Sequence, residues 1–201
     1  MTSPYAFYQF FLQAEDAKVI EYLKVFSPRS RDEIEELAEQ TELQPHLRLA
    51  QRALADDVTA LVHSPAERDA AVAAGEALFG KSDLAELSES TVQGIVAELP
   101  HHVLTAGDPA DAGTASLTHT AGQLPTTLDV LTVSGVASSR SEARRAIVQG
   151  GAYLNNERVT DPDARLTPES LLHGRYVIAR RGKRTVGAVT IDRSATTTHG
   201  A

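Results

Sequence analysis

Apolar residues recur every three or four positions through the first hundred residues of the chain, which is the period of one buried face of an α-helix. SPYAFYQFFLQA and EDAKVIEYLKVF follow this spacing, and within residues 46–63 one apolar stripe runs from Leu47 through Leu54 to Val62. The pattern predicts six helices, at about residues 3–14, 15–26, 31–40, 46–63, 66–79 and 89–98.

Two of these helices carry signals for their ends. Ser30 and Glu33 form a capping-box pair at the start of RDEIEELAEQ, in which each side chain accepts from a free backbone N–H. Ser64 suits the cap of the helix that begins at Pro65, and Gly80 stands where a left-handed residue ends it. The first hundred residues therefore predict a small all-α domain.

The apolar period changes in the last third of the chain. TTLDVLTVSG and SRSEARRAIVQGG predict two short helices, the second opened by Ser139 with Glu142 and ended by Gly150–Gly151. AYLNNERVT predicts a tight hairpin, because Asn155–Asn156 tolerate the positive φ angles of a two-residue turn. GRYVIARRGKRTVGAVTID predicts two further strands around Arg181–Gly182–Lys183. Two helices on a small sheet make an α+β module.

Composition and charge divide the chain in the same place. Residues 105–123, TAGDPADAGTASLTHTAGQ, hold few large apolar side chains, so burial cannot offset the entropy of ordering them. Residues 1–123 contain 8 Lys and Arg against 20 Asp and Glu, whereas residues 124–201 contain 11 against 7. We therefore expect an α+β chain in four parts: a helical domain at 1–104, a flexible linker at 105–123, an α+β domain at 124–193 and a disordered tail at 194–201.

The overall composition narrows the class of protein. A hydrophobic fraction of 42% with 23% charged residues is typical of a globular protein. The absence of cysteine excludes disulfides and cysteine-based zinc sites. No apolar run reaches the ~18–20 residues needed to cross a bilayer, and we find no signal peptide. We therefore expect no membrane association and a cytoplasmic location.

A cluster of cations interrupts this acidic chain. Residues 138–156, SSRSEARRAIVQGGAYLNN, contain Arg140, Arg144 and Arg145, and the only acid among them is Glu142. A one-sided cationic surface is typical of nucleic-acid binding, and a set of surface salt bridges is the alternative. With the predicted strands, the cluster gives ten candidate RNA-binding residues: Ser139, Arg140, Ser141, Arg144, Arg145, Gln149, Arg180, Arg181, Lys183 and Arg184.

GEALFGKS at residues 75–82 has the spelling of a phosphate-binding P-loop without its context. A P-loop follows a buried strand and opens a helix, whose N-terminal N–H groups then surround the phosphates. Here an alanine-rich helix precedes the motif, so Gly80 would lie at the negative end of a helix dipole. His101 and His102 lack metal-ligand spacing. We expect no nucleotide site, no catalytic set and no metal site.

The basic segment also has a family likeness. TLDVL, SRSEARRAI, GGAYLNN and VTD resemble, in this order, the S4 RNA-binding domain over residues 126–165. HGRYVIARRGKR resembles its completion in the C-terminal domain of bacterial tyrosine–tRNA ligase. TSPYAFYQFFLQAEDAKVIEYLKVFS, LAQRALADDVTALVHS and EALFG resemble the helical anticodon-binding domain that precedes S4 in that enzyme. The resemblance covers nearly the whole chain and implies a helical domain joined to a small S4-type, αL-like domain.

This resemblance implies the RNA-binding half of a tyrosine–tRNA ligase, a class I aminoacyl-tRNA synthetase, with the catalytic Rossmann domain absent. The expected partner is tRNA(Tyr), with a separate catalytic domain in trans as a further candidate; the oligomeric state is left open. No cofactor is expected in this chain, since ATP and tyrosine would bind the catalytic domain, and we expect the chain alone to be inactive. A stand-alone S4-type regulator that binds structured RNA is the alternative.

Overall fold

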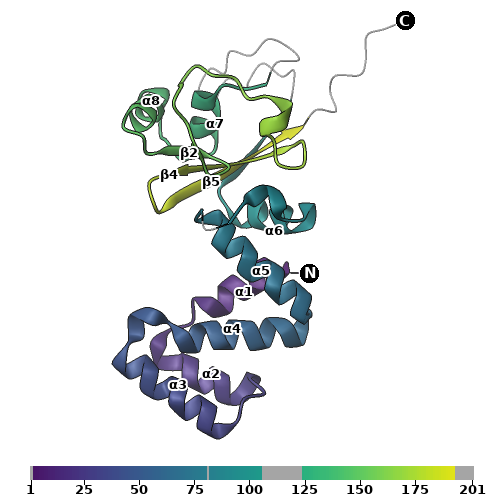
Figure 1. The fold of residues 1–201 in the computed structure, drawn as a ribbon, viewed down its shortest axis with the longest axis vertical. Helices are drawn as coiled ribbons and strands as arrows, with labels where there is room; N and C mark the ends of the chain where they lie inside the picture. The colour runs from purple at the N-terminus through teal and green to yellow at the C-terminus, as the bar shows by residue number, and fades with distance from the viewer. Residues whose placement is uncertain (1, 81, 106–123, 193–201) are drawn as a thin grey trace, which may run out of the picture. The chain divides into compact units, whose positions relative to one another are not determined.

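A computed structural model describes residues 2–80, 82–105 and 124–192 of the chain. The chain divides into two compact units, Met1–Gly75 and Glu76–Ala201 (Figure 1). Eight α-helices and five strands lie within the described residues, so the α+β class predicted from the sequence is confirmed.

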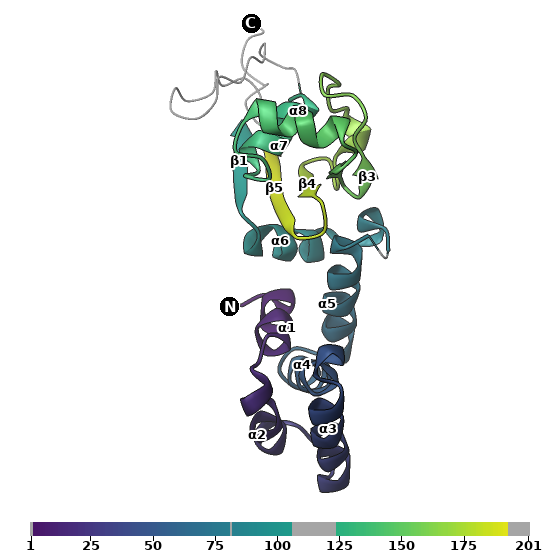
Figure 2. The ribbon, with the colours of Figure 1, turned by 90° about the vertical axis from the view of Figure 1, so that its left-hand side faces the viewer.

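The first unit is all-α, as its sequence predicts. Its helices are α1 (Pro4–Leu12), α2 (Asp16–Phe26), α3 (Arg31–Leu43), α4 (Leu49–Val62) and most of α5 (Pro65–Leu78), with a 3-10 turn, η1, at Pro45–Leu47. Helices α1, α2 and α3 all pack against α4 (Figure 2). The predicted stripe of α4 is buried at Leu54, whereas Leu61 near the end of the helix is 72% exposed.

The predicted helix ends are confirmed in this unit. Ser30 Oγ accepts from the N–H of Glu33 at 3.3 Å, and the Glu33 carboxylate accepts from the N–H of Ser30 at 2.8 Å. Hydrogen bonds from the backbone and then the hydroxyl of Ser30 hold the pKa of Glu33 below its usual value. Ser64 Oγ likewise accepts from the N–H of Glu67, at 3.1 Å.

The second unit is built on a five-stranded sheet. Its helices after α5 are α6 (Glu89–Glu98), α7 (Thr127–Val133) and α8 (Arg140–Val148), with 3-10 turns η2 (Leu84–Glu86) and η3 (Pro168–Ser170). The strands are β1 (His101–Thr105), β2 (Ala152–Leu154), β3 (Glu157–Arg158), β4 (Tyr176–Arg181) and β5 (Thr185–Asp192). Their spatial order is β1-β5-β4-β2-β3, in which β1 runs parallel to β5 and the other neighbours are antiparallel.

Both faces of this sheet are covered. Alternate residues of a strand point to opposite faces, and Val177, Ala179 and Val189 face a core shared with α7 and α8. Ile178 and Ala188 are buried on the other face, where α6 packs. Figure 2 shows α7 and α8 on one side of the sheet and α6 on the other. Burial of both faces explains why β4 and β5 carry apolar runs rather than a strict alternation.

The predicted hairpin forms between β2 and β3. Asn155 and Asn156 have φ angles of 47° and 68°, as the two-residue turn requires. The Asn155 side chain also donates to the carbonyl of Ser170 and accepts from the N–H of Ile178, both at 2.8 Å. Asn156 donates to the carbonyl of Ala77 at 2.6 Å. The two asparagines therefore serve the fold.

Residues 75–80 of GEALFGKS lie at the end of a helix, as the context predicted. α5 runs to Leu78, and Gly80 has the left-handed conformation, with φ of 78°, that follows a helix. Among the described residues, a helix precedes this segment where a P-loop needs a strand. The free groups at this end of α5 are carbonyls, which repel phosphate.

The expected domain boundary at residue 104 is wrong. β1 joins the sheet, where His102 pairs with Val189 and Val103 pairs with Thr190, so residues 76–105 belong to the second unit. β1 is an exposed edge strand that begins with two histidines. Its sequence therefore lacks the apolar pattern of a buried strand, and the sequence alone did not predict it. The rest of the expected linker, 106–123, and the expected tail, 194–201, lie outside the described residues.

Gly187 of β5 lies against the backbone that follows α7. A Cβ atom at this position would lie 2.1 Å from the carbonyl oxygen of Ser134, which cannot swing aside as a side chain would. We expect Gly187→Ala to lower the free energy of unfolding by about 1–3 kcal/mol, measured by urea denaturation. Gly151→Ala is the matched control, because a Cβ there would lie at an ordinary 3.7 Å from the carbonyl oxygen of Ala146. Equal stability of the two variants would contradict this packing.

Candidate nucleic-acid interface

α8 carries the cationic cluster, and its packing separates its residues into two sets. Ala143 and Ile147 are buried in the core of the second unit, whereas Arg144, Arg145 and Gln149 are exposed. The amphipathic pattern of SRSEARRAIVQ thus holds the helix on the sheet with its cationic side toward solvent.

Two serines close the N-terminus of α8. Ser139 Oγ accepts from the N–H of Glu142 at 3.2 Å, as predicted. The Glu142 carboxylate, however, accepts from the N–H and the hydroxyl of Ser138, at 2.7 and 2.5 Å, rather than from Ser139. Ser139 is therefore a cap residue, and Ser141 is the candidate serine whose exposed side chain has no hydrogen bond among the described residues.

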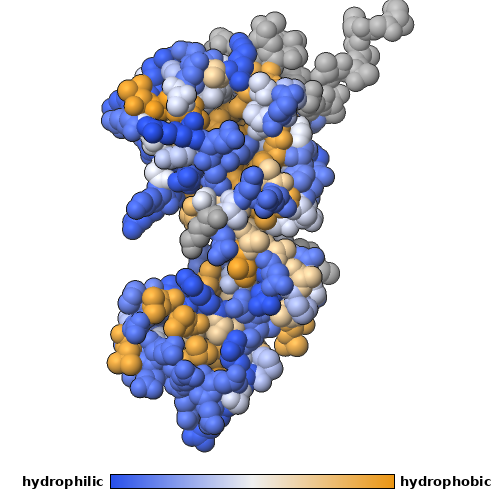
Figure 3. All heavy atoms as spheres, viewed as in Figure 1, coloured by the Kyte–Doolittle hydropathy of each residue, from blue (hydrophilic) through white to orange (hydrophobic). Residues whose placement is uncertain are grey.

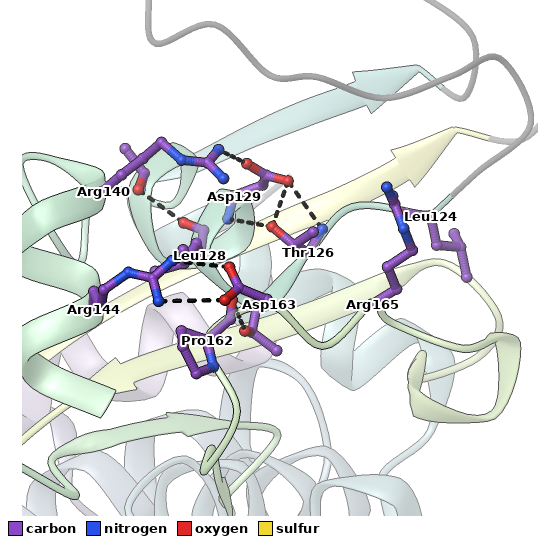
Figure 4. Close-up of polar contacts among 11 residues, drawn as sticks. Leu124, Thr126, Leu128, Asp129, Arg140, Arg144, Pro162, Asp163 and Arg165 are labelled. Carbon is purple, nitrogen blue, oxygen red and sulfur yellow. Dashed lines mark hydrogen bonds and ion pairs between the residues drawn. The ribbon is translucent and has the colours of Figure 1, made fainter. Parts of the chain in front are cut away.

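Arg140 forms an ion pair with a buried carboxylate. Asp129 of α7 is 2% exposed, and its Oδ2 accepts from the N–H of Thr126 at 3.0 Å and from the Thr126 hydroxyl at 2.6 Å. Its Oδ1 accepts from Arg140 Nη1 (Figure 4). This ion pair joins the first turn of α7 to the first residue of α8, so Arg140 has a structural role.

Arg144 has a weaker, exposed partner. Its two terminal nitrogens donate to the two carboxylate oxygens of Asp163, at 2.9 and 3.3 Å (Figure 4). The side chains are 50% and 68% exposed, so solvent screens this pair, and pairs of this kind contribute about 0–1 kcal/mol. A phosphate could take the place of Asp163 at little cost.

Glu142 links α8 to the sheet. In addition to Ser138, its carboxylate accepts from Arg181 Nη1 at the end of β4. The hydrogen bonds from Ser138, followed by the guanidinium of Arg181, lower the pKa of Glu142 to about 2. At neutral pH this carboxylate is therefore ionised, and it holds Arg181 beside α8.

In the fold, the cluster has more acidic neighbours than the Glu142 of its own stretch. Arg140, Arg144 and Arg181 each pair with an acid, and Asp129 and Asp163 come from outside the basic stretch. Asp129 had a signal in the sequence, because TTLD places an acid at the third helical position after a capping threonine. Asp163 had none, since a loop brings it to α8. The salt-bridge alternative therefore holds for three of the candidates.

Three of the candidate cations have no acidic partner in the described part of the chain. Arg145, Lys183 and Arg184 are exposed, and they form no ion pair within residues 2–80, 82–105 and 124–192. Arg145 lies on α8, and the other two lie in the turn between β4 and β5. Figure 3 shows hydrophilic side chains over the end of this strand pair.

Arg180 does not join the other candidates. Arg181 shares a face of the sheet with α8, so Arg180, its neighbour in the same strand, points to the opposite face. There its guanidinium lies 4.3 Å from the centre of the Tyr153 ring, and its Nη1 donates to the carbonyl of Gly182 at 2.8 Å. Arg180 therefore lies outside the candidate interface, because strand alternation separates it from Arg145.

A shallow hollow of about 390 Å³ lies between α8 and the β4–β5 turn. Arg145, Gln149, Arg181 and Glu142 all line it. In this hollow, candidate residues from the helix and from the strands meet. Its donors are two guanidinium groups and an amide, which suit a phosphate oxygen.

Two further kinds of site concern the described residues, a metal centre and a membrane span. No group of three His, Cys, Asp or Glu side chains among them could hold a metal ion. Within the same residues, no helix is long and apolar enough to cross a membrane.

Comparison with known proteins gives two family matches. Residues 111–189 match the model described as the tyrosine–tRNA ligase SYY-like C-terminal domain, and residues 1–80 match that of class I tRNA synthetases (W and Y). The tyrosine–tRNA ligase of Cutibacterium acnes is 51% identical over 94% of this chain and 42% of its own length. That of Kineococcus radiotolerans is 49% identical over 95% of this chain and 42% of its own.

Among solved structures, a C-terminally truncated mitochondrial tyrosyl-tRNA synthetase of Aspergillus nidulans is 38% identical. The match covers 39% of this chain and 23% of that one, with a TM-score of 0.38. The chain thus spans about two fifths of the length of the curated relatives it matches.

The two ion pairs of α8 shown in Figure 4 should differ in their effect on stability. Arg140→Ala removes a charged hydrogen bond from the buried Asp129, and we expect it to lower the free energy of unfolding by about 2 kcal/mol. Arg144→Ala removes only an exposed pair and should cost less than about 1 kcal/mol. Urea denaturation of both variants measures the difference. Equal losses would show that the buried pair has no special weight.

The lowered pKa of Glu142 predicts a pH dependence of stability. Its folded pKa of about 2 lies below the unfolded value of about 4.3. Its contribution is therefore complete above roughly pH 5 and is lost as the pH falls toward 2. We expect the stability difference between wild type and Glu142→Gln to shrink over this range, measured by urea denaturation at several pH values. Glu157→Gln is the control, and a difference that stays constant for Glu142→Gln would refute the assignment.

Proposed function

The chain belongs to the tyrosine–tRNA ligase family, and we propose that it forms the part of such an enzyme that binds tRNA(Tyr). The observation that carries this proposal is the separation of the arginines around α8. Ion pairs with acids hold Arg140 and Arg181 in place, while the exposed side chains of Arg145, Lys183 and Arg184 pair with no acid among the described residues. Cations that the fold does not use are available to neutralise RNA phosphates.

The proposed contacts position RNA without reading its sequence. Arg145, Lys183 and Arg184 would contact phosphates, and Ser141 and Gln149 would add hydrogen bonds. Arg144 joins them where a phosphate replaces the exposed carboxylate of Asp163. In this proposal the second unit is an S4-type domain that grips the RNA backbone. The helical first unit then lies near the anticodon, where base recognition requires exposed polar or aromatic side chains.

We assign tyrosine activation and its transfer to tRNA to a longer protein of the relatives' length, and not to this chain alone. We propose that ATP and tyrosine bind the part of those relatives that does not align with this chain, and that a separate catalytic domain could work with this chain in trans. The expected setting is the cytoplasm. A preference for another structured RNA over tRNA would instead support an S4-type regulator.

Binding of tRNA(Tyr) across a salt series tests the proposal. We expect the affinity, measured by fluorescence anisotropy, to fall steeply with salt, because each phosphate contact contributes roughly −0.7 to −0.9 to the log–log slope. The variant Arg145→Ala/Lys183→Ala/Arg184→Ala should bind more weakly and with a slope shallower by about two to three.

Arg175→Ala is the matched control. Arg175 precedes β4, so about 20 Å of strand separates it from the turn at the other end. The Arg175→Ala substitution removes one positive charge from the same unit, and we expect it to leave the log–log slope of affinity against salt unchanged. A triple variant with wild-type affinity would refute the proposed interface. Equal affinity for a non-cognate tRNA would show that the surface binds RNA in general.

A further inference from the structure

Hydrogen bonds hold the backbone that borders the hollow between α8 and the β4–β5 turn. The N–H of Gly182 donates to the carbonyl of Gly151 at 2.9 Å, which fastens the turn to the residues that end α8. From the other face of the sheet, Arg180 donates to the carbonyl of Gly182 at 2.8 Å. The backbone of the turn is therefore fixed from both sides, and the position of the hollow's cations depends on their side chains.

Arg145 and Arg181 differ in how their side chains are held. Arg145 forms no ion pair among the described residues and is free to change rotamer. Arg181 is 35% exposed and is bound through Nη1 to Glu142, whose own carboxylate is held by the N–H and hydroxyl of Ser138. A guanidinium has five N–H donors, so the bond to Glu142 leaves others to face the hollow.

We propose that Glu142 is a positioning residue, which holds Arg181 at the wall of this hollow so that Arg181, Arg145 and Gln149 bind one RNA phosphate there. This inference rests on the proposed function, because it specifies how the tRNA-binding surface takes a phosphate. Glu142 acts through Arg181 and does not itself contact the RNA.

The physical basis is preorganisation. A free arginine loses rotamer freedom when it binds a phosphate, and that loss weakens binding. Glu142 imposes the loss on folding, before RNA arrives. The carboxylate also repels a phosphate, so the two effects have opposite signs. Glu142 lines the hollow, but its ion pair with Arg181 offsets its negative charge there, and for that reason we infer that positioning outweighs repulsion.

Replacement of Glu142 separates this inference from simple charge counting. Glu142→Gln removes a negative charge from a phosphate-binding surface, so charge alone predicts tighter binding of tRNA(Tyr). The positioning role predicts the reverse, a loss of about three- to tenfold in affinity at fixed salt. Fluorescence anisotropy with the full chain measures the sign directly, and thermal unfolding verifies that the variant is folded.

Two single variants control for side effects. Glu157→Gln removes an exposed acid of β3, whose side chain makes no hydrogen bond among the described residues, and it should leave affinity unchanged or slightly improved. Ser138→Ala removes one hydrogen bond from Glu142 but leaves Arg181 paired. It should therefore cost less affinity than Glu142→Gln, whereas an equal loss would assign the effect to the helix cap and overturn the proposal.

A double-mutant cycle with Arg181→Gln completes the test. If Glu142 acts through Arg181, Glu142→Gln should have no further unfavourable effect on tRNA affinity in the Arg181→Gln background. The same loss in both backgrounds, or tighter binding by Glu142→Gln alone, would overturn the inference while leaving the tRNA-binding function intact. Failure of the wild-type chain to bind tRNA would instead refute the proposed function.

Discussion

The buried carboxylate of Asp129 is the constraint on which the rest of the second unit's surface depends. It accepts a hydrogen bond from the N–H of Thr126, which caps the first turn of α7, and it forms an ion pair with Arg140, the first residue of α8. An ionised group in an apolar interior is stable only when hydrogen bonds and an opposite charge surround it. The orientation of α8 on the sheet therefore follows from this pair together with the apolar contacts of Ala143 and Ile147.

With α8 fixed in this way, the other ion pairs divide the arginines by function. Glu142 draws Arg181 to the helix, and Asp163 lies over Arg144 at the exposed side. Arg145 then projects from a helix that three other charged contacts already hold. Paired charges thus hold the helix and strand that present the cationic surface. An acidic chain can have such a surface because the acids near it are paired with Arg140, Arg144 and Arg181, and most of the others lie in residues 1–123.

Strand geometry sets the limits of that surface. Arg180 and Arg181 are neighbours in the chain, yet they lie on opposite faces of β4, one over Tyr153 and the other beside Glu142. Pairing of β1 with β5 likewise assigns residues 101–105 to the sheet and makes the second unit larger than the α+β segment seen in the sequence.

The sequence by itself determined the local features of this protein. Helix spacing, the Ser30–Glu33 cap, the left-handed Gly80 and the Asn155–Asn156 turn all depend on residues a few positions apart, and the resemblance to tyrosine–tRNA ligases was carried by contiguous motifs. Only the tertiary structure decided which arginines are free. Asp163 and Arg144 are 19 residues apart in the sequence, and Arg181 and Glu142 are 39 residues apart. β1 and β5, which pair in the sheet, lie near opposite ends of the second unit's sequence. Charge counts along a chain cannot reveal such partners, because Coulomb attraction acts over distances in space that the fold alone establishes.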